Sequence, residues 1–257
     1  MLNIAITAGG TSENIDGVRK LTNVSTGSLG WNCLEAVLNY FQKKNYSDFR
    51  IFYILTETAF RKELNEKQKS LVEFISVSDA ESVYKAVDEL TKNVHISHFI
   101  HSMAISDFTF AYAANTCELA MEISSMQTRG EANEIAVREA LENPINQFNT
   151  DEKIPSDDNI IIGLKRTKKV IPIIKQNNPE TFLVGFKLLR DVSENELIDV
   201  ANRLAEKNKC DMVFANQLAQ IAEHNHSGML IKNGEVIARP IGKKQIAETV
   251  VKNMLDM

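Results

Sequence analysis

The chain has 257 residues, of which 44% are hydrophobic and 25% are charged, the balance of a globular protein that buries a core. Its formal net charge of −5 argues against a nucleic-acid surface. No apolar run approaches the roughly 18 residues that span a bilayer, and the N-terminal MLNIAITAGG lacks the basic start of a signal peptide, so we expect a cytoplasmic protein with no membrane partner.

Short hydrophobic runs alternate with amphipathic segments along the chain. The runs predict strands over 2–8, 50–56, 71–77, 98–105, 181–188 and 211–216. The amphipathic segments predict helices over about 29–44, 79–94, 194–208 and 242–256. The strands are apolar on both faces, as strands covered by helices must be. The predicted fold class is therefore α/β, with a doubly wound, mostly parallel, Rossmann-like sheet.

Two segments depart from this alternation. MLIKNGEVIA (229–238) consists of two alternating runs around Asn233-Gly234, which predicts a C-terminal β-hairpin with a type I′ turn. Residues 108–160 begin with a stretch that predicts one or two helices and end in the polar NTDEKIPSDDN, which predicts an exposed loop. Because no Pro/Gly/Ser-rich linker divides the chain, we expect one domain over 1–257. The segment 108–160 is then an inserted excursion that acts as a lid or a dimer contact.

The stretch TAGGTSENIDGVRKLTNVSTGSLG (7–30) follows the first predicted strand and holds several of the chain's 11 glycines. Glycines at this point of a βα unit let the backbone approach a phosphate, and the N-terminus of the next helix offers unpaired N–H groups. The spacing fits neither GxGxxG nor GxxxxGK[ST]. Spacing alone therefore leaves two interpretations open: a phosphate site, or a long loop with capping hydroxyls.

The residues themselves show a family resemblance. TAGGTxExIDxVR followed by TNxSTGxxG closely resembles the N-terminal signature of the phosphopantothenoylcysteine synthetase (phosphopantothenate–cysteine ligase) family. Further similar segments follow in the same order: SMAISDF (102–108), KIPS (153–156), LVGFKLL (183–189) and DMVFANQL (211–218). The similar segments lie between residue 4 and about residue 250. The resemblance is to the stand-alone bacterial form, which implies a single ligase domain.

This resemblance implies a reaction and its co-substrates. The family joins 4′-phosphopantothenate and L-cysteine to give 4′-phosphopantothenoyl-L-cysteine in coenzyme A biosynthesis. The substrate carboxylate attacks CTP to form an acyl-cytidylate and pyrophosphate, and the cysteine amine then displaces CMP. The sequence leaves open whether the nucleotide is CTP or ATP. The resemblance also implies Mg²⁺, with ligands that the sequence does not identify, and a homodimer that binds no nucleic acid.

The resemblance assigns residues to three tasks. Catalytic roles fall to Asn23, Asp107 and Lys153. The substrate contacts fall to Asn23, Met103, Ala104 and Asp107. The nucleotide contacts fall to Gly9, Gly10, Ser25, Gly27, Gly30, Met103, Asp107, Lys153, Phe186, Lys187, Lys207 and Asn216. An amide suits the task of Asn23, because it donates to one oxygen of an acyl-nucleotide and accepts from the substrate amide without carrying charge.

Some features depart from the family pattern and keep two other classes of function open. LKRTKKVI (164–171) replaces the family's Asn-Pro segment, and Lys207 lies four residues before Asp211 where three is usual. One alternative is a dinucleotide-dependent oxidoreductase, for which Glu57 would end the second strand. The other is a non-catalytic nucleotide-binding regulator on the same fold.

Cysteine and histidine spacings point to no metal or disulfide framework. The three cysteines are far apart and in no CxxC spacing, so neither a disulfide framework nor a zinc site is expected. His95, His98 and His101 recur every third residue at a predicted helix-to-strand transition. Their side chains would point to different faces there, which disfavours zinc.

Overall fold

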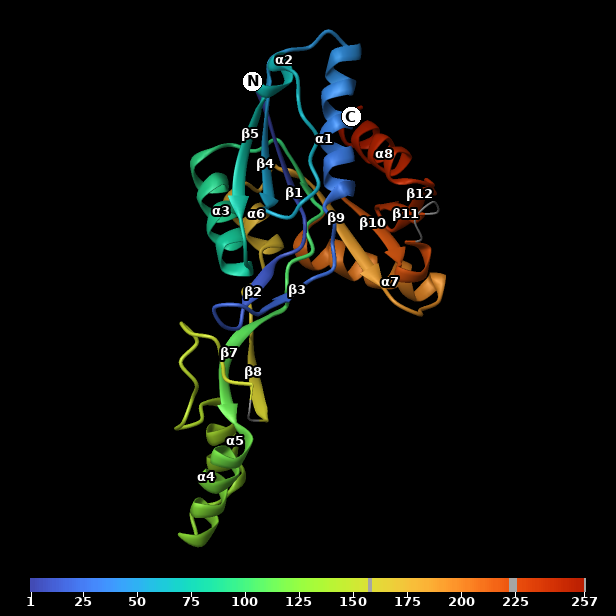
Figure 1. The fold of residues 1–257 in the computed structure, drawn as a ribbon. Coiled ribbons are helices and arrows are strands. Elements are labelled where there is room, and N and C mark those ends of the chain that lie inside the picture. Colours follow the sequence, from blue (N-terminus) through green and yellow to red (C-terminus); the bar gives the residue numbers. More distant parts are fainter. Residues whose placement is uncertain (157–158, 222–225, 257) are drawn as a thin grey trace. The chain divides into compact units, whose positions relative to one another are not determined.

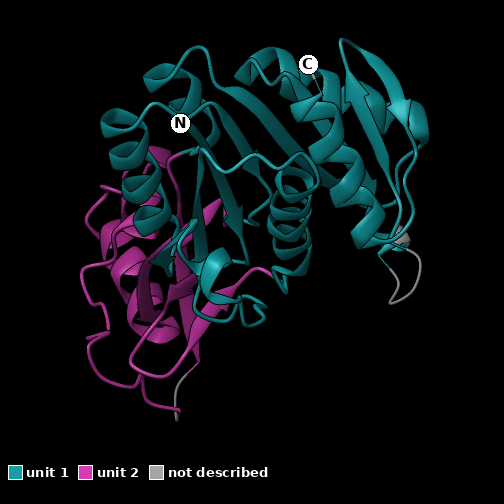
Figure 2. Ribbon diagram, turned by 90° about the horizontal axis from the view of Figure 1, so that it is seen from above, with its two compact units in different colours: residues 1–11, 24–105, 169–257 teal, residues 12–23, 106–168 magenta. Residues whose placement is uncertain are grey.

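A computed structural model describes residues 1–156, 159–221 and 226–256 (Figure 1). The chain divides into two compact units, coloured separately in Figure 2. Unit 1 comprises residues 1–11, 24–105 and 169–257, and unit 2 comprises residues 12–23 and 106–168. The predicted excursion 108–160 lies within unit 2, apart from residues 157–158, which are outside the described residues. A single ligase domain over 1–257 stays a prediction.

Unit 1 is built on an eight-stranded sheet in the order β12-β11-β10-β9-β6-β1-β4-β5. The strands are β1 (Leu2–Ala8), β4 (Phe49–Thr56), β5 (Val72–Val77), β6 (His98–His101), β9 (Phe182–Leu189), β10 (Met212–Gln217), β11 (Met229–Lys232) and β12 (Glu235–Ala238). The six neighbouring strands β5, β4, β1, β6, β9 and β10 pair in parallel. Strands β11 and β12 extend the sheet beyond β10 as antiparallel strands. The parallel strands follow the doubly wound order 3-2-1-4-5-6, so the predicted fold class is confirmed.

Helices cover both faces of this sheet, which is why its strands are apolar on both sides. Helices α1 (Ser28–Lys43) and α8 (Lys243–Leu255) pack on the face that buries Ile4 and Ile6. The other face, which buries Ala5, carries α3 (Ala80–Asn93) and α6 (Ile171–Asn177), and α7 (Glu194–Asn208) packs against β10 on its own apolar cluster. The short α2 (Glu66–Lys69) and the 3-10 turn η1 (Leu218–Gln220) complete unit 1.

The C-terminal hairpin is confirmed in position and turn type. Asn233 and Gly234 have φ of 52° and 84°, the left-handed pair that a type I′ turn requires. A bulge between Leu230 and Ile231 shifts the pairing of β11 with β12. The strand predicted over 98–105 is shorter than expected: β6 ends at His101, and Ala104 returns to form an isolated parallel bridge with Gly10.

Unit 2 contains an antiparallel ribbon that the sequence reading missed. Its elements are β2 (Ser12–Asn14), β3 (Lys20–Thr22), β7 (Phe108–Asn115), α4 (Thr116–Thr128), α5 (Glu134–Glu142) and β8 (Ile160–Arg166). The expected helices form over α4 and α5, but the helical interpretation of residues 108–115 was wrong. Those residues pair with β8, and the paired backbone explains why an alanine-rich segment is a strand.

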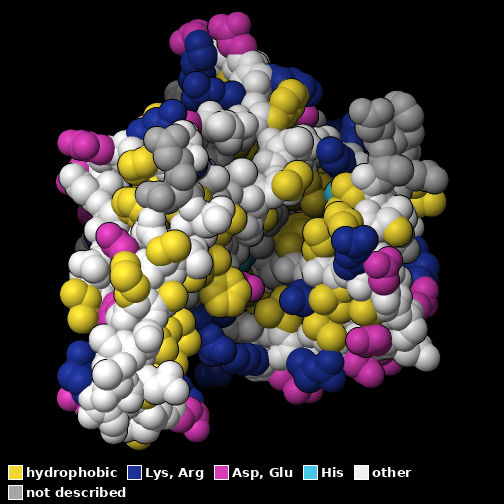
Figure 3. All heavy atoms as spheres, turned by 60° about the horizontal axis from the view of Figure 1, so that its bottom comes forward, with side chains coloured by type: hydrophobic (Ala, Val, Ile, Leu, Met, Phe, Trp, Pro, Cys, Tyr) yellow, Lys and Arg dark blue, Asp and Glu magenta, His cyan; other side chains and the backbone are white. Residues whose placement is uncertain are grey.

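Hydrophobic side chains lie at the surface of this ribbon. Phe108, Ile162 and Leu164 keep 47%, 40% and 46% of their surface exposed, and hydrophobic side chains are visible on the face of the protein drawn in Figure 3. Exposed apolar groups of this kind are typical of surfaces that bind another chain. The homodimer stays a prediction. Within the described residues, every helix is too short or too polar to cross a bilayer.

Candidate functional site

The carboxyl ends of β1 and β6 form the switch point of the sheet, where doubly wound proteins bind their ligands. Gly9 and Gly10 follow β1, and Met103 and Ala104 follow β6. The Ala104 N–H donates to the Gly9 carbonyl at 2.9 Å, and the Ala104 carbonyl accepts from the Thr11 N–H at 3.0 Å. The structure thus brings four of the predicted residues together at this edge.

Glycine is required at this point because backbones meet at close range. Gly9 has φ +101°, and a Cβ added to it would lie 2.1 Å from Thr56 Oγ1. Gly27 has φ +70°, and its added Cβ would lie 3.0 Å from the Gly9 nitrogen. Both conformations favour glycine. Gly30 lies inside α1, where an added Cβ would lie 2.5 Å from Ala8 Cβ. These glycines hold the start of α1 against the end of β1.

The N-terminus of α1 carries the features of an anion site. Gly27 is its N-cap, and among the described residues neither a side-chain cap nor an acidic first-turn residue occupies it. Ser25 Oγ accepts from the Gly27 N–H at 3.4 Å, and Thr26 Oγ1 and Ser28 Oγ lie 2.9 Å apart. The Ser28 N–H donates to Thr26 Oγ1 at 3.4 Å, so both hydroxyl contacts at the helix start are long. The positive end of the helix dipole favours a phosphate here.

Two further predicted residues lie on the same face of the sheet as α1 and α8. Phe186, inside β9, packs against Phe214, with ring centroids 5.6 Å apart. Asn216 at the end of β10 is buried, and its Nδ2 lies 3.3 Å from His226 Nε2. Strand alternation turns Lys187, next to Phe186, toward the other face.

Lys207 is not brought to this edge. It lies exposed in the last turn of α7, which leads into the start of β10. In a parallel βαβ unit that point is the amino end of the strands, opposite the switch point. The family resemblance that suggested a nucleotide contact for Lys207 therefore receives no support from its position, and the contact stays a prediction.

The remaining predicted residues belong to unit 2. Asn23 follows β3 and is half-buried, whereas Asp107 and Lys153 are exposed. The Asp107 carbonyl accepts from the Thr167 N–H at 3.1 Å. These three lie in unit 2, and the other predicted site residues lie in unit 1.

A buried carboxylate that the sequence reading did not single out lies beside Lys153. Asp16 accepts from the N–H groups of Val18 (2.9 Å), Arg19 (2.7 Å) and Ile154 (3.1 Å), and it pairs with the Arg19 guanidinium at 2.8 Å. Burial acts to raise the pKa of Asp16, but these donors outweigh it and hold the pKa below its usual value. Asp16 therefore fixes the backbone next to Lys153. The sequence signal was an Asp followed by glycine, which is typical of an Asx turn.

His101 is a neutral structural group at the switch point. Burial lowers its pKa to about 4, so the ring is uncharged at neutral pH. Its Nδ1 lies 3.1 Å from Thr7 Oγ1, which also accepts from the Met103 N–H at 3.2 Å. Ser102 Oγ donates to the Thr7 carbonyl at 2.6 Å. These bonds fix the path of the segment after β6.

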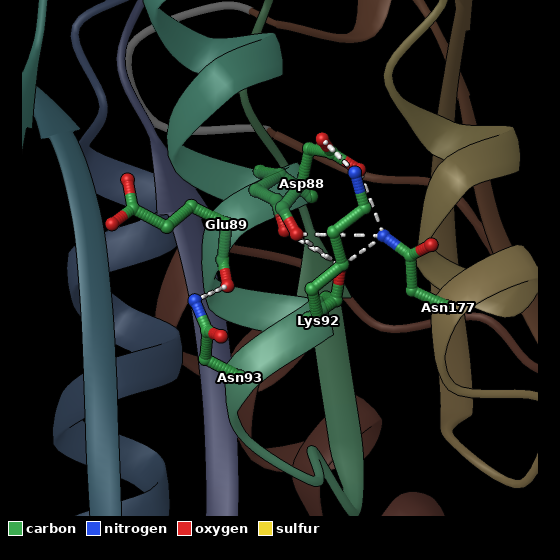
Figure 4. A network of polar contacts seen from close by, with 7 residues as sticks. Asp88, Glu89, Lys92, Asn93 and Asn177 are labelled. Carbon is green, nitrogen blue, oxygen red and sulfur yellow. Dashed lines mark hydrogen bonds and ion pairs between the residues drawn. The ribbon is translucent and has the colours of Figure 1, made fainter.

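A polar network elsewhere in unit 1 is structural in character (Figure 4). Asp88 on α3 pairs with Lys92 at 2.7 Å, and Asn177 on α6 donates to Asp88 Oδ1 at 3.0 Å and to Thr91 Oγ1 at 2.9 Å. A cavity of about 250 Å³ adjoins it at the end of α3. Because Lys92 and Asp88 neutralise each other, the network joins two helices and leaves no charge for a ligand.

Fold and loop together define the class of protein. It is a doubly wound α/β protein with a glycine-rich loop and, at its switch point, a helix N-terminus that has no acidic residue in its first turn among the described residues. The chain belongs to the DNA/pantothenate metabolism flavoprotein C-terminal domain family, whose sequence profile matches residues 1–128 and 143–257.

Similar proteins agree with that family. The chain is 24% identical over 95% of its length to the coenzyme A biosynthesis bifunctional protein CoaBC of Thermococcus kodakarensis, and 26% identical over 98% to that of Methanocaldococcus jannaschii. It covers 49% and 50% of those proteins, so it spans about half the length of the curated relatives it matches. A crystal structure of the DNA/pantothenate metabolism flavoprotein from Streptococcus pneumoniae aligns with TM-score 0.78 and 28% identity, over 100% of this chain and 99% of that one.

Proposed function

We propose that the protein acts in coenzyme A biosynthesis as the ligase that joins 4′-phosphopantothenate to L-cysteine, with CTP as the activating nucleotide. The observation that carries the proposal is the glycine loop at the switch point, where Gly9 and Gly27 pack too closely for any Cβ and so hold the N-terminus of α1 at the end of β1. The family and the coenzyme A biosynthesis proteins among its relatives support it.

The proposed reaction has two steps. A carboxylate is a poor acylating agent because oxide would have to leave. The carboxylate oxygen of phosphopantothenate therefore attacks the α-phosphorus of CTP, the bond to the β-phosphate oxygen breaks, and pyrophosphate leaves. The cysteine amine then attacks the acyl carbon of the acyl-cytidylate, its proton passes to solvent or a base, and CMP leaves with the bonding electron pair. Positioning and charge stabilisation are the main contributions an enzyme makes to such steps.

The residues in unit 1 fit a nucleoside triphosphate. The N–H groups at the start of α1 would donate to phosphate oxygens, and the close packing of Gly9 and Gly27 holds that helix end beside the end of β1. Phe186 and Asn216 would contact the base or ribose. Magnesium would neutralise phosphate charge, and we assign it no protein ligand.

The residues in unit 2 would act on the acyl group. Asn23 would hold the carboxylate and then the acyl-cytidylate, Asp107 would contact the pantothenate portion, and Lys153 would contact phosphate. Asp16 supports this assignment for Lys153, because it fixes the neighbouring Ile154 backbone.

Pyrophosphate release tests the proposal directly. With CTP or ATP side by side, we expect release that depends on phosphopantothenate, and phosphopantothenoylcysteine on addition of cysteine. Binding without turnover would favour a nucleotide-binding regulator, and hydride transfer with NAD(P) an oxidoreductase; either result without pyrophosphate release refutes the ligase.

Asn23→Asp tests the site within that reaction. The variant loses one donor to developing negative charge, which costs on the order of 3 kcal/mol or roughly a hundredfold in rate. CTP affinity and melting temperature should stay near wild type. Asn14→Asp, at an exposed position of β2, is the matched control and should keep full activity. Wild-type turnover in Asn23→Asp would remove this residue from the mechanism.

A further inference from the structure

A lysine from the last helix reaches the N-terminus of the first. Lys243 is the first residue of α8, and its Nζ donates to Ser28 Oγ at 2.8 Å. Ser28 is the first residue of α1, and its hydroxyl also lies 2.9 Å from Thr26 Oγ1. Lys243 is 215 positions away from Ser28 in the chain, and only the fold brings its ammonium to the glycine loop.

This position is electrostatically unfavourable for a lysine on its own. The N-terminus of a helix is the positive end of its dipole, where anions are favoured and cations are not. Lys243 is itself in the first turn of α8, whose N-cap is Gly242 at φ 87°, so the positive end of a second helix dipole lies at the same point. Among the described residues, neither helix has an acidic residue in its first turn or a side-chain cap, and Lys243 forms no ion pair. Three sources of positive potential therefore meet, and no negative group among the described residues pairs with Lys243.

The hydroxyl of Thr56, which contacts the glycine loop from β4, is a second group that an anion at this point would satisfy. Thr56 at the end of β4 is 3% exposed, and its Oγ1 has no hydrogen-bond partner among the described residues. That oxygen is the nearest atom to a Cβ added on Gly9, closer than Thr56 Cβ, so the hydroxyl is directed at the loop. A buried hydroxyl without a partner costs stability. A phosphate oxygen bound in the loop would accept its hydrogen bond.

We propose that Lys243 is a further binding residue for a polyphosphate anion seated at the N-terminus of α1, with Thr56 as a second donor from β4. The identification of that anion as the triphosphate of a nucleotide rests on the proposed function. The anion site itself rests on the geometry of unit 1. Lys243 supplies the positive charge that the glycine loop lacks, since the loop of residues 9–10 and 25–30 contains no cation.

Binding of inorganic tripolyphosphate and of CTP, measured by titration calorimetry on the full chain, tests the proposal. Lys243→Gln keeps a donor for Ser28 and removes the charge, and we expect it to raise both dissociation constants by about tenfold or more and to weaken their salt dependence. Lys244→Gln, the same change at the exposed next position, should stay within about twofold. Thr56→Val, which replaces the hydroxyl by a methyl group of similar size, should raise both constants severalfold. Lys243→Arg, which keeps the positive charge, should retain most of the wild-type affinity.

The outcomes distinguish the anion site, the role of Lys243 and the proposed ligase function from one another. Equal affinity in wild type and Lys243→Gln, equal losses in the two glutamine variants, or no tripolyphosphate binding by the wild type overturns the anion site. Lys243-dependent binding of tripolyphosphate without any pyrophosphate release in the ligase assay supports the anion site and refutes the proposed function. Normal ligase turnover with Lys243-independent binding supports the function and refutes the role of Lys243. Melting temperatures identify any variant that fails to fold, and Lys243→Arg and Thr56→Val then carry the test.

Discussion

Replacing Gly30 by alanine sets two effects of opposite sign against each other. Alanine has the higher helix propensity, which would stabilise α1 by about 1 kcal/mol. The new methyl group would lie 2.5 Å from Ala8 Cβ, 3.2 Å from Ala8 Cα and 3.0 Å from Ser102 Oγ. Because Ala8 is fully buried in the central strand, its Cβ has no rotamer by which to move aside. The helix must therefore shift away from the sheet.

Overpacking of this kind costs about 1–3 kcal/mol, and contact with a backbone-fixed atom places this site near the upper end. After the gain in helix propensity, we expect a net loss of about 2 kcal/mol in the free energy of unfolding. For a chain of this length that lowers the melting temperature by about 4–8 °C. A displaced α1 N-terminus should also weaken the binding of tripolyphosphate.

Urea unfolding followed by circular dichroism and by the fluorescence of Trp31, the chain's one tryptophan, measures this loss. Trp31 is fully buried in α1, so its emission reports on the packing of that helix. Asn39→Ala, at an exposed position of the same helix, should leave stability unchanged or raise it by up to about 0.7 kcal/mol. A Gly30→Ala variant as stable as wild type would refute the close-contact reasoning.

Three further predictions concern stability and reactivity. Asn178 is buried and accepts from the Ile96 N–H at 2.6 Å, so Asn178→Ala should lose about 2 kcal/mol in the free energy of urea unfolding. Asn93→Ala, at an exposed position, should stay within about 0.5 kcal/mol of wild type, and similar losses in the two variants would contradict this reasoning. Burial lowers the pKa of His101 to about 4, below its ordinary 6.5. Its contribution to stability is therefore complete above pH 6.5 and lost as the pH falls toward 4, by up to about 3 kcal/mol, and His101→Leu should flatten the unfolding free energy over that range. A thiol reagent should modify the exposed Cys117 in the folded protein and spare Cys33, whose pKa burial raises to about 12; rapid labelling of both would show that Cys33 is accessible.

The sequence predicted the core of the fold because local pattern and tertiary structure agree there. Runs such as 2–8 and 50–56 are apolar on both faces, and the central strands of a covered parallel sheet require that. Residues 108–115 were misinterpreted because their partner β8 lies far along the chain and FTFAYAAN carries no strict alternation. Helix α6 has only seven residues, too few to show a helical period.

The candidate site was predictable where it follows strand ends and unpredictable where it depends on distant helices. Gly10 and Ala104 could be expected together because parallel strands end at one edge. Lys243 carries no local signal, since a lysine at a helix start usually contacts solvent. Lys207 shows the converse case. A likeness in sequence suggested a nucleotide contact, which stays a prediction, whereas the topology of α7 places this residue at the other end of the sheet.

The bulge between Leu230 and Ile231 bears on how the sheet avoids self-association. A sheet edge presents unpaired N–H and C=O groups that can template the addition of a strand from another molecule. Here the edge strand β12 has only four residues, and the bulge in its partner twists the pair away from a flat ladder. Lys232 and Glu235 add charge beside the turn. The C-terminal hairpin therefore ends the sheet at a strand that is a poor template for aggregation.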